Sequence, residues 1–292
     1  MTWFFIALSS AFLSAFAAIT QKKVLFNLGA LEFSFLLSFV NFLLSIPFFF
    51  FIDYQTINST NLLVLFIKSF IGVGAFLCVM ISLKNLEISN VLPLLALTPG
   101  FVAIFAFIFL GESLKSIEVI GLVFLIAGTF ILENKNSKNF FLTFSVFFKS
   151  KYHRIILLAL LLFTASSILD KFLLIRLNLS PLSLTAIQHI YFVFLFSLLY
   201  LFFKNKENAA SIKIRKENLG WILLISIITI GYRYTQLLAV SLASVALVLA
   251  IKRTSVFWAT VIGGKIFNDK DLLKRSVAAI LILIGTILIL RD

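Results

Sequence analysis

Ten long apolar runs follow one another along the chain of 292 residues, and few charged residues interrupt them. A helix crosses the roughly 30 Å hydrocarbon core of a bilayer with about 20 predominantly apolar residues. The runs approach that length and lack the short alternating pattern of membrane β-barrel strands. They predict ten membrane-spanning helices, over Thr2–Gln21, Glu32–Ile52, Leu62–Leu83, Asn90–Leu110, Ile117–Leu132, Ile155–Ile175, Leu182–Phe203, Leu219–Ala239, Leu242–Lys265 and Leu273–Leu290.

The composition excludes most soluble classes, because 61% of the residues are hydrophobic and only 13% are charged, against about a quarter charged in soluble domains. Cys78 is the single cysteine and there are two histidines, which leaves no cluster for a metal site. The connections are mostly short, so there is little room for a soluble catalytic domain. We expect an all-α polytopic protein of the cell membrane, with the lipid bilayer as partner. We expect no enzyme activity, catalytic residue, cofactor, metal or nucleic-acid partner.

The second half of the chain repeats polar and glycine positions of the first half at an offset of 157 residues. The matched positions are Gly74 with Gly231, Glu112 with Asp269, and Gly128-Thr129 with Gly285-Thr286. Because these are not common apolar residues, chance alignment of hydrophobic helices is the weaker explanation.

The repeat predicts two units of five spans, over residues 1–134 and 153–292, joined by a linker over residues 135–152. An odd number of spans per unit makes the second unit enter the membrane with opposite orientation, which is the inverted repeat of many secondary carriers. Within the linker, Phe140–Phe148 is either a short helix in the membrane interface or plain linker.

Three short motifs recur in an order typical of one superfamily. They are Leu110-Gly111-Glu112-Ser113-Leu114 after the fourth span, the Gly-Thr pair in the fifth and tenth spans, and Asp170-Lys171 in the sixth. With them the whole chain resembles the drug/metabolite transporter superfamily, EamA-type. This resemblance implies a ten-helix transporter of two five-helix repeats. It names no substrate, since similar folds carry different solutes.

The formal charge of +13 is distributed unevenly between the two sides of the predicted bundle. Three basic residues, Lys115, Arg176 and Arg291, fall in one set of alternate loops and the termini. Sixteen fall in the other set: Lys22, Lys23, Lys84, Lys135, Lys138, Lys149, Lys151, Arg154, Lys204, Lys206, Lys213, Arg215, Lys216, Lys270, Lys274 and Arg275. Since Lys and Arg stay on the cytosolic side, we expect both termini outside.

Three cations, Arg233, Lys252 and Arg253, lie near the middle of the eighth and ninth spans. A basic residue at a helix centre costs about 2.5 to 3.5 kcal/mol on insertion scales. Every acid, Asp170 included, falls at a predicted span end or in a loop. We therefore expect these cations to line a wet cavity and to bind an anion that the substrate supplies. Pairing with buried carboxylates stays open as the structural alternative.

The run Ala250–Val256 is similar to the ninth helix of the plastid sugar-phosphate translocators and their nucleotide-sugar relatives. That resemblance implies Lys252 and Arg253 as phosphate ligands. The first half offers only Lys68 and Lys84, which lie near predicted span ends.

Four further residues complete the set of candidate substrate-binding residues. Gln236 and Tyr232 are expected to position Arg233 or to contact the solute. Lys171 lies at the boundary of the sixth span, where its long side chain can reach water. His189 either titrates near neutral pH and couples transport to protons, or is a hydrogen-bonded structural residue.

The sequence therefore predicts a secondary transporter that moves a small anionic metabolite, bearing a phosphate or carboxylate, by alternating access. Exchange of one anion for another suits a cationic site, because the cations then do not remain in the membrane without a bound anion. The alternatives are an exporter of amino acids or amphipathic metabolites and a flippase of a lipid-linked phosphate. The oligomeric state is not indicated.

Overall fold

The computed structural model describes residues 2–97, 116–133, 150–203, 216–242 and 245–289, and all regular structure within them is helical. The first unit contributes α1 (Thr2–Leu25), α2 (Ala30–Ser45) with the 3-10 turn η1 (Ile46–Phe50), the short η2 (Tyr54–Thr56), α3 (Ser59–Asn85), α4 (Ile88–Leu95) and α6 (Ser116–Glu133). The second contributes α9 (Lys151–Lys171) with the π-helical turn η3 (Phe172–Arg176), α10 (Pro181–Phe203), α11 (Lys216–Leu242), α12 (Val245–Trp258) with the π-helical turn η5 (Ala259–Gly263) and α13 (Gly264–Ile266), and α14 (Leu272–Ile289).

Six of these helices are long and apolar enough to cross a membrane: Thr2–Leu25, Ala30–Phe50, Ser59–Asn85, Lys151–Arg176, Pro181–Phe203 and Asn218–Leu242. Shorter apolar helices complete the bundle, and the expected all-α polytopic class is confirmed. The predicted fourth span is described only up to Leu97, so its remainder lies outside the described residues. The same holds for the Leu110–Leu114 motif and almost all of the linker, and the unit boundaries stay a prediction.

Local signals in the chain set where the helices begin. The side chain of Asn58 accepts a hydrogen bond from the Asn61 N–H at 2.8 Å and caps α3. Pro181 opens α10, where its missing N–H costs nothing. Just before it, Ser180 Oγ accepts from the Ser183 N–H at 3.0 Å. Caps of this kind fix the point at which each apolar run enters the bundle.

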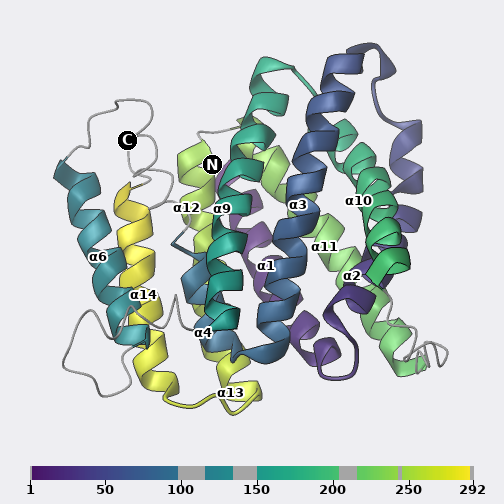
Figure 1. Cartoon of the computed structure of the whole chain (residues 1–292). Helices are drawn as coiled ribbons and strands as arrows, with labels where there is room; N and C mark the ends of the chain where they lie inside the picture. The colour runs from purple at the N-terminus through teal and green to yellow at the C-terminus, as the bar shows by residue number, and fades with distance from the viewer. Residues whose placement is uncertain (1, 98–115, 134–149, 204–215, 243–244, 290–292) are drawn as a thin grey trace.

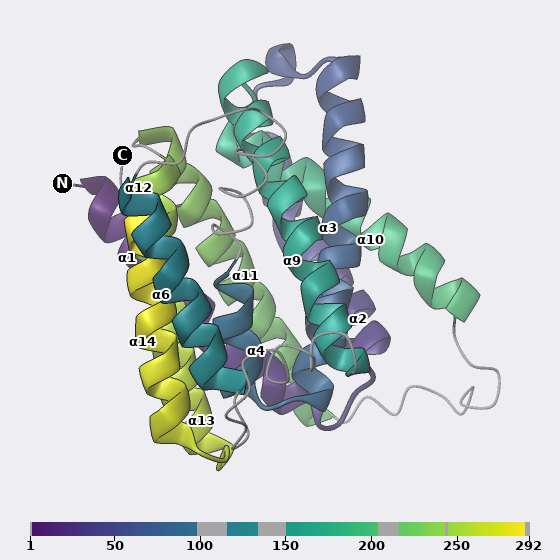
Figure 2. The same ribbon diagram turned by 60° about the vertical axis from the view of Figure 1, so that its left-hand side comes forward.

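Successive helices run alternately between the two ends of the bundle, so that the first residues of α1 and the last residues of α14 lie toward the same end (Figures 1 and 2). Contacts between the units follow an approximate twofold relation. α1 packs on α11 as α9 packs on α3, α2 packs on α11 as α10 packs on α3, and α6 and α14 pair with each other, as do α2 and α10. This exchange of equivalent helices is the inverted repeat expected from the sequence.

The glycines matched by the repeat explain why α6 and α14 lie so close at one edge of the bundle (Figure 1). A Cβ added at Gly128 would lie 3.0 Å from the Ala278 carbonyl oxygen on α14. A Cβ added at Gly285 would lie 2.6 Å from the Gly121 carbonyl oxygen on α6. The helices therefore touch through backbone at equivalent positions, which is the usual role of small residues between membrane helices.

Large apolar side chains cover much of the outer surface of the bundle, among them Phe70, Val123 and Ile227. In water such a surface would associate, whereas in a bilayer it meets lipid tails of the same character. The apolar exterior and the polar interior described below belong to a membrane protein.

Candidate central binding site

A cavity of about 270 Å³ lies inside the bundle, and eight helices supply its walls. They are α1 to α4 of the first unit and α9 to α12 of the second. Six of the seven candidate residues line it: Arg233, Lys252, Arg253, Gln236, Tyr232 and His189. The side chain of Lys171 lies outside what the structure describes. The tertiary structure thus brings the six residues together, while substrate binding by them stays a prediction.

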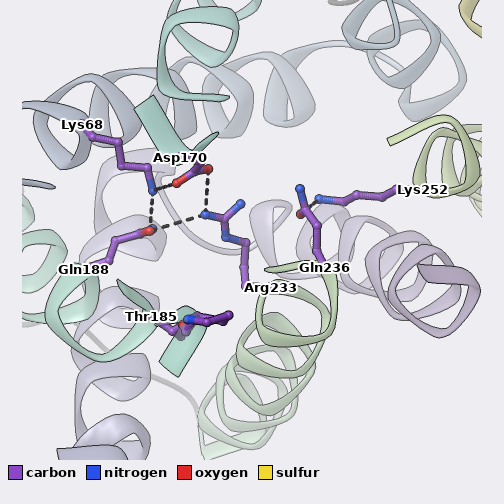
Figure 3. A network of polar contacts seen from close by, with 8 residues as sticks. Lys68, Asp170, Thr185, Gln188, Arg233, Gln236 and Lys252 are labelled. Atoms are coloured by element: carbon purple, nitrogen blue, oxygen red, sulfur yellow. Dashed lines mark hydrogen bonds and ion pairs between the residues drawn. The ribbon is translucent and has the colours of Figure 1, made fainter. Parts of the chain in front are cut away.

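One end of the cavity holds a network of charges from four helices (Figure 3). The Asp170 carboxylate on α9 forms ion pairs with Lys68 Nζ on α3 at 2.9 Å and with Arg233 Nη2 on α11 at 3.3 Å. Gln188 Oε1 on α10 accepts hydrogen bonds from Arg233 at 3.4 Å and from Lys68. Lys68 is only 1% exposed, so this carboxylate is its essential counter-ion.

Asp170 corrects the expectation that the central cations have no protein counter-ion. It was placed at the end of a span, but the predicted span runs to Ile175 and α9 with η3 runs to Arg176, so Asp170 lies more than one turn inside the helix. Because α9 packs along α3, the carboxylate faces Lys68. Lys68 was likewise placed near a span end, although it lies more than two turns into α3 and is buried. The sequence signal for this pair was a single Lys and a single Asp within otherwise apolar runs.

α11 and α12 supply further polar residues of the cavity lining. Lys252 Nζ donates a hydrogen bond to Gln236 Oε1 and lies 5.2 Å from the centroid of the Tyr232 ring, which favours a cation. Gln236 was expected to hold Arg233 or the solute, but among the described residues its hydrogen bond is to Lys252. Arg233 is held instead by Asp170 and Gln188, because it points toward α9 and α10 (Figure 3).

Arg253 lines the cavity and has no ion pair or hydrogen bond within the part of the chain that the structure describes. Lys252 likewise has no carboxylate partner there. Counting Lys68, Arg233, Lys252 and Arg253 against Asp170, the described lining carries four positive charges and one negative charge, a surplus of three. Such a cavity attracts anions.

His189 on α10 is 4% exposed, and neither ring nitrogen has a hydrogen-bond partner among the described residues. The alternative that it is a hydrogen-bonded structural residue is therefore wrong for the described structure. Its imidazole lines the cavity.

The two units furnish the cavity differently. At the offset of 157 residues, Phe76 and Leu95 of the first unit correspond to Arg233 and Lys252 of the second, and all four line the cavity. Equivalent positions are thus apolar on one side of the cavity and cationic on the other. A ligand with a charged end and an uncharged body matches this polarity.

Among the described residues no three His, Cys, Asp or Glu side chains gather to hold a metal ion. The chemistry that the site offers is ionic and hydrogen-bonding recognition.

Comparison with known proteins gives two findings. Residues 1–133 match the EamA-like transporter family. A crystal structure of another protein superimposes with a TM-score of 0.67 over 98% of this chain and 96% of its own. At 12% identity that likeness shows the fold alone. No curated protein matches the chain in sequence.

The family match confirms the resemblance to EamA-type transporters over residues 1–133 and agrees with the apolar helices. That part of the chain matches a family of integral membrane transporters, which are not enzymes.

Proposed function

We propose that the chain carries a small anionic metabolite, bearing a phosphate or carboxylate group, across the membrane by alternating access. The observation that supports this is the charge of the central cavity, where four cations face one carboxylate. Lys252 and Arg253 hold no carboxylate partner among the described residues, so a ligand anion is the group that would compensate them. The guanidinium of Arg253 offers a fork of donors that matches two oxygens of a phosphate or carboxylate.

The dimensions of the cavity support a small substrate. A volume of about 270 Å³ holds about nine water molecules at roughly 30 Å³ each. It lies just below the usual volumes of small-molecule sites, about 300 to 1,000 Å³. This favours a metabolite of a few carbon atoms over a nucleotide sugar or a lipid-linked phosphate.

Asp170 bears on the alternative of an amino-acid exporter, because its carboxylate could accept a ligand ammonium. Both of its oxygens already face cations, at 2.9 and 3.3 Å. A substrate ammonium would have to displace Lys68 or Arg233. The site therefore favours a simple anion over a zwitterion.

An exchange mode follows from the same charges. Without a bound anion, Lys252 and Arg253 have no counter-ion among the described residues and are part-buried, which is costly within a membrane. Departure of one anion with entry of another avoids that state. The approximate twofold relation between the units supports rocking of one unit against the other around the cavity.

Binding and flux of inorganic phosphate test this function. Phosphate should stabilise the detergent-purified protein by mass action, by about 2.7 kcal/mol of unfolding free energy at one hundred times Kd, and so raise its melting temperature. Methylammonium should give no shift. Arg253→Gln should weaken phosphate binding, whereas Arg154→Gln, which changes an exposed arginine of α9, should not. Labelled phosphate should also exchange into proteoliposomes preloaded with phosphate.

Two results would count against the proposal. Equal protection of wild type and Arg253→Gln by phosphate would remove Arg253 from the site. Absence of both protection and exchange with phosphate and with short carboxylates would refute anion transport.

A further inference from the structure

Three residues of the cavity wall have buried polar atoms without a hydrogen-bond partner among the described residues. Asn41 Oδ1, both ring nitrogens of His189 and Thr229 Oγ1 are buried and have no partner within the described ranges. The three residues are 5%, 4% and 7% exposed, and all of them line the central cavity. Since the great majority of buried polar groups in proteins are paired, each such atom calls for an explanation.

Neighbouring hydroxyl groups on the same helices show what an ordinary arrangement looks like. Ser38 on α2 donates to the Phe35 carbonyl at 2.8 Å, and Thr185 on α10 donates to the Pro181 carbonyl at 2.7 Å. On α11, Thr235 Oγ1 donates to the Gly231 carbonyl at 2.8 Å. Thr229 lies on the same helix and makes no such bond. Thr229 lines the cavity, and its buried hydroxyl has no partner among the described residues.

The three unpartnered groups belong to one wall. Asn41, His189 and Thr229 lie on α2, α10 and α11, and each of these helices packs against the other two. Thr229 precedes Arg233 by four residues, which places both on one face of α11. His189 follows Gln188 of the charge network. Thr229 and His189 thus lie on the same helices as Arg233 and Gln188 of the charge network.

The chemistry of these atoms specifies their complement. The Asn41 oxygen only accepts, a neutral imidazole has one donor and one acceptor nitrogen, and a threonine hydroxyl does both. An ionised carboxylate or a fully ionised phosphate only accepts, so it cannot satisfy an accepting oxygen. A hydroxyl group donates and accepts, and so matches all three.

We propose that the substrate is a hydroxylated anion, whose charged group lies at Arg233, Lys252 and Arg253 and whose hydroxyl groups bind Asn41, His189 and Thr229. This inference rests on the proposed function of the site. It narrows the substrate class to phosphate esters of polyols or hydroxy acids, and it makes the three residues determinants of specificity. A site built to bond a hydroxyl strongly rejects the analogue without it, because its own polar groups are then left unpaired.

Pairs of ligands that differ only in hydroxyl groups test the inference on the purified full-length protein. Glycerol 3-phosphate is compared with n-propyl phosphate, and lactate with propionate, by calorimetry. In at least one pair the Kd of the hydroxylated ligand should be at least about tenfold lower than that of the analogue without the hydroxyl. The pair that shows the preference identifies the charged group.

Variants locate the preference. Thr229→Val keeps the shape of the side chain but lacks the hydroxyl, and should cut the ratio within the pair severalfold while binding of the deoxy ligand persists. Thr235→Val is the matched control on the same helix, since that hydroxyl is bonded to the backbone, and it should leave the ratio unchanged. His189→Phe and Asn41→Leu should act as Thr229→Val does.

Failure of this inference is distinguishable from failure of the proposed function. If wild type binds both members of each pair equally, the hydroxyl sites are wrong, while anion binding stands. The same conclusion follows if Thr229→Val, His189→Phe and Asn41→Leu all keep the wild-type ratio. If no anion binds, the proposed function falls with it. The wild-type ratio needs no variant, so misfolding of a variant cannot mask the result.

Discussion

Replacing Asp170 with asparagine removes the only carboxylate that contacts Lys68 and Arg233 among the described residues. The shape of the side chain is kept, so the change isolates the charge. Lys68 is 1% exposed and cannot be hydrated without opening the bundle. Removal of one partner of a buried pair costs about 3 to 5 kcal/mol, because the other charge stays buried and uncompensated. Arg233 is 20% exposed and faces the cavity, so we assign most of the cost to Lys68.

Thermal melting in detergent gives the measurement. With a shift of roughly 2 to 4 °C per kcal/mol, Asp170→Asn should lower the melting temperature by roughly 6 to 20 °C. Glu87→Gln is a control, because it breaks the ion pair of Glu87 with Arg275, in which Glu87 is 35% and Arg275 15% exposed. Neither partner is as buried as Lys68, and pairs that reach solvent contribute less than buried ones, so this control should lower the melting temperature less than Asp170→Asn does.

The double variant Lys68→Met with Asp170→Asn tests whether the loss of stability comes from the unpaired Lys68 ammonium. Removing both charges leaves no stranded ammonium, and replacing a buried pair by neutral groups is often neutral or stabilising. The double variant should therefore melt well above Asp170→Asn alone. The reasoning is refuted if Asp170→Asn has the melting temperature of wild type, or if the double variant is no more stable than Asp170→Asn alone.

Two further measurements test the packing and the orientation. Gly285→Ala should destabilise the protein by at least about 1 kcal/mol, as overpacking does, because the new Cβ would lie 2.6 Å from a carbonyl oxygen of α6. Gly220→Ala is the control, since there is open space around Gly220, and its melting temperature should equal or exceed that of wild type. In a Cys78→Ser background, a membrane-impermeant maleimide applied to whole cells should label Asp53→Cys, which lies on the predicted outer side, and spare Asn27→Cys. The reverse labelling pattern would show that both termini are cytosolic.

The sequence by itself determined the architecture. In a bilayer every backbone N–H and C=O must be bonded within its own segment, so continuous apolar runs can only be helices. The repeat of Gly128 at Gly285 indicated equivalent helices, and the structure places both glycines at the α6–α14 crossing. These signals are local or periodic, which is why they can be read without coordinates.

The site was predicted only in part. Arg233, Lys252 and Arg253 stood out because a cation in an apolar run is costly wherever it points, and the structure brings them to one cavity. Lys68 and Asp170 did not stand out, since each lay near an estimated span end. Each nevertheless lies more than one turn inside its helix, and their pairing depends on how α3 packs against α9, which the hydropathy of the chain does not fix.

Only the tertiary structure decided which groups meet. The Asp170 carboxylate faces Lys68 because α9 of one unit packs on α3 of the other, a contact between segments about one hundred residues apart. The packing of α2, α10 and α11 leaves Asn41 Oδ1, the His189 ring and Thr229 Oγ1 at the cavity wall without partners among the described residues. A side chain's partners depend on the rotation of its helix against neighbours from the other repeat. Spacing along the chain fixes the faces of a helix but not what those faces meet.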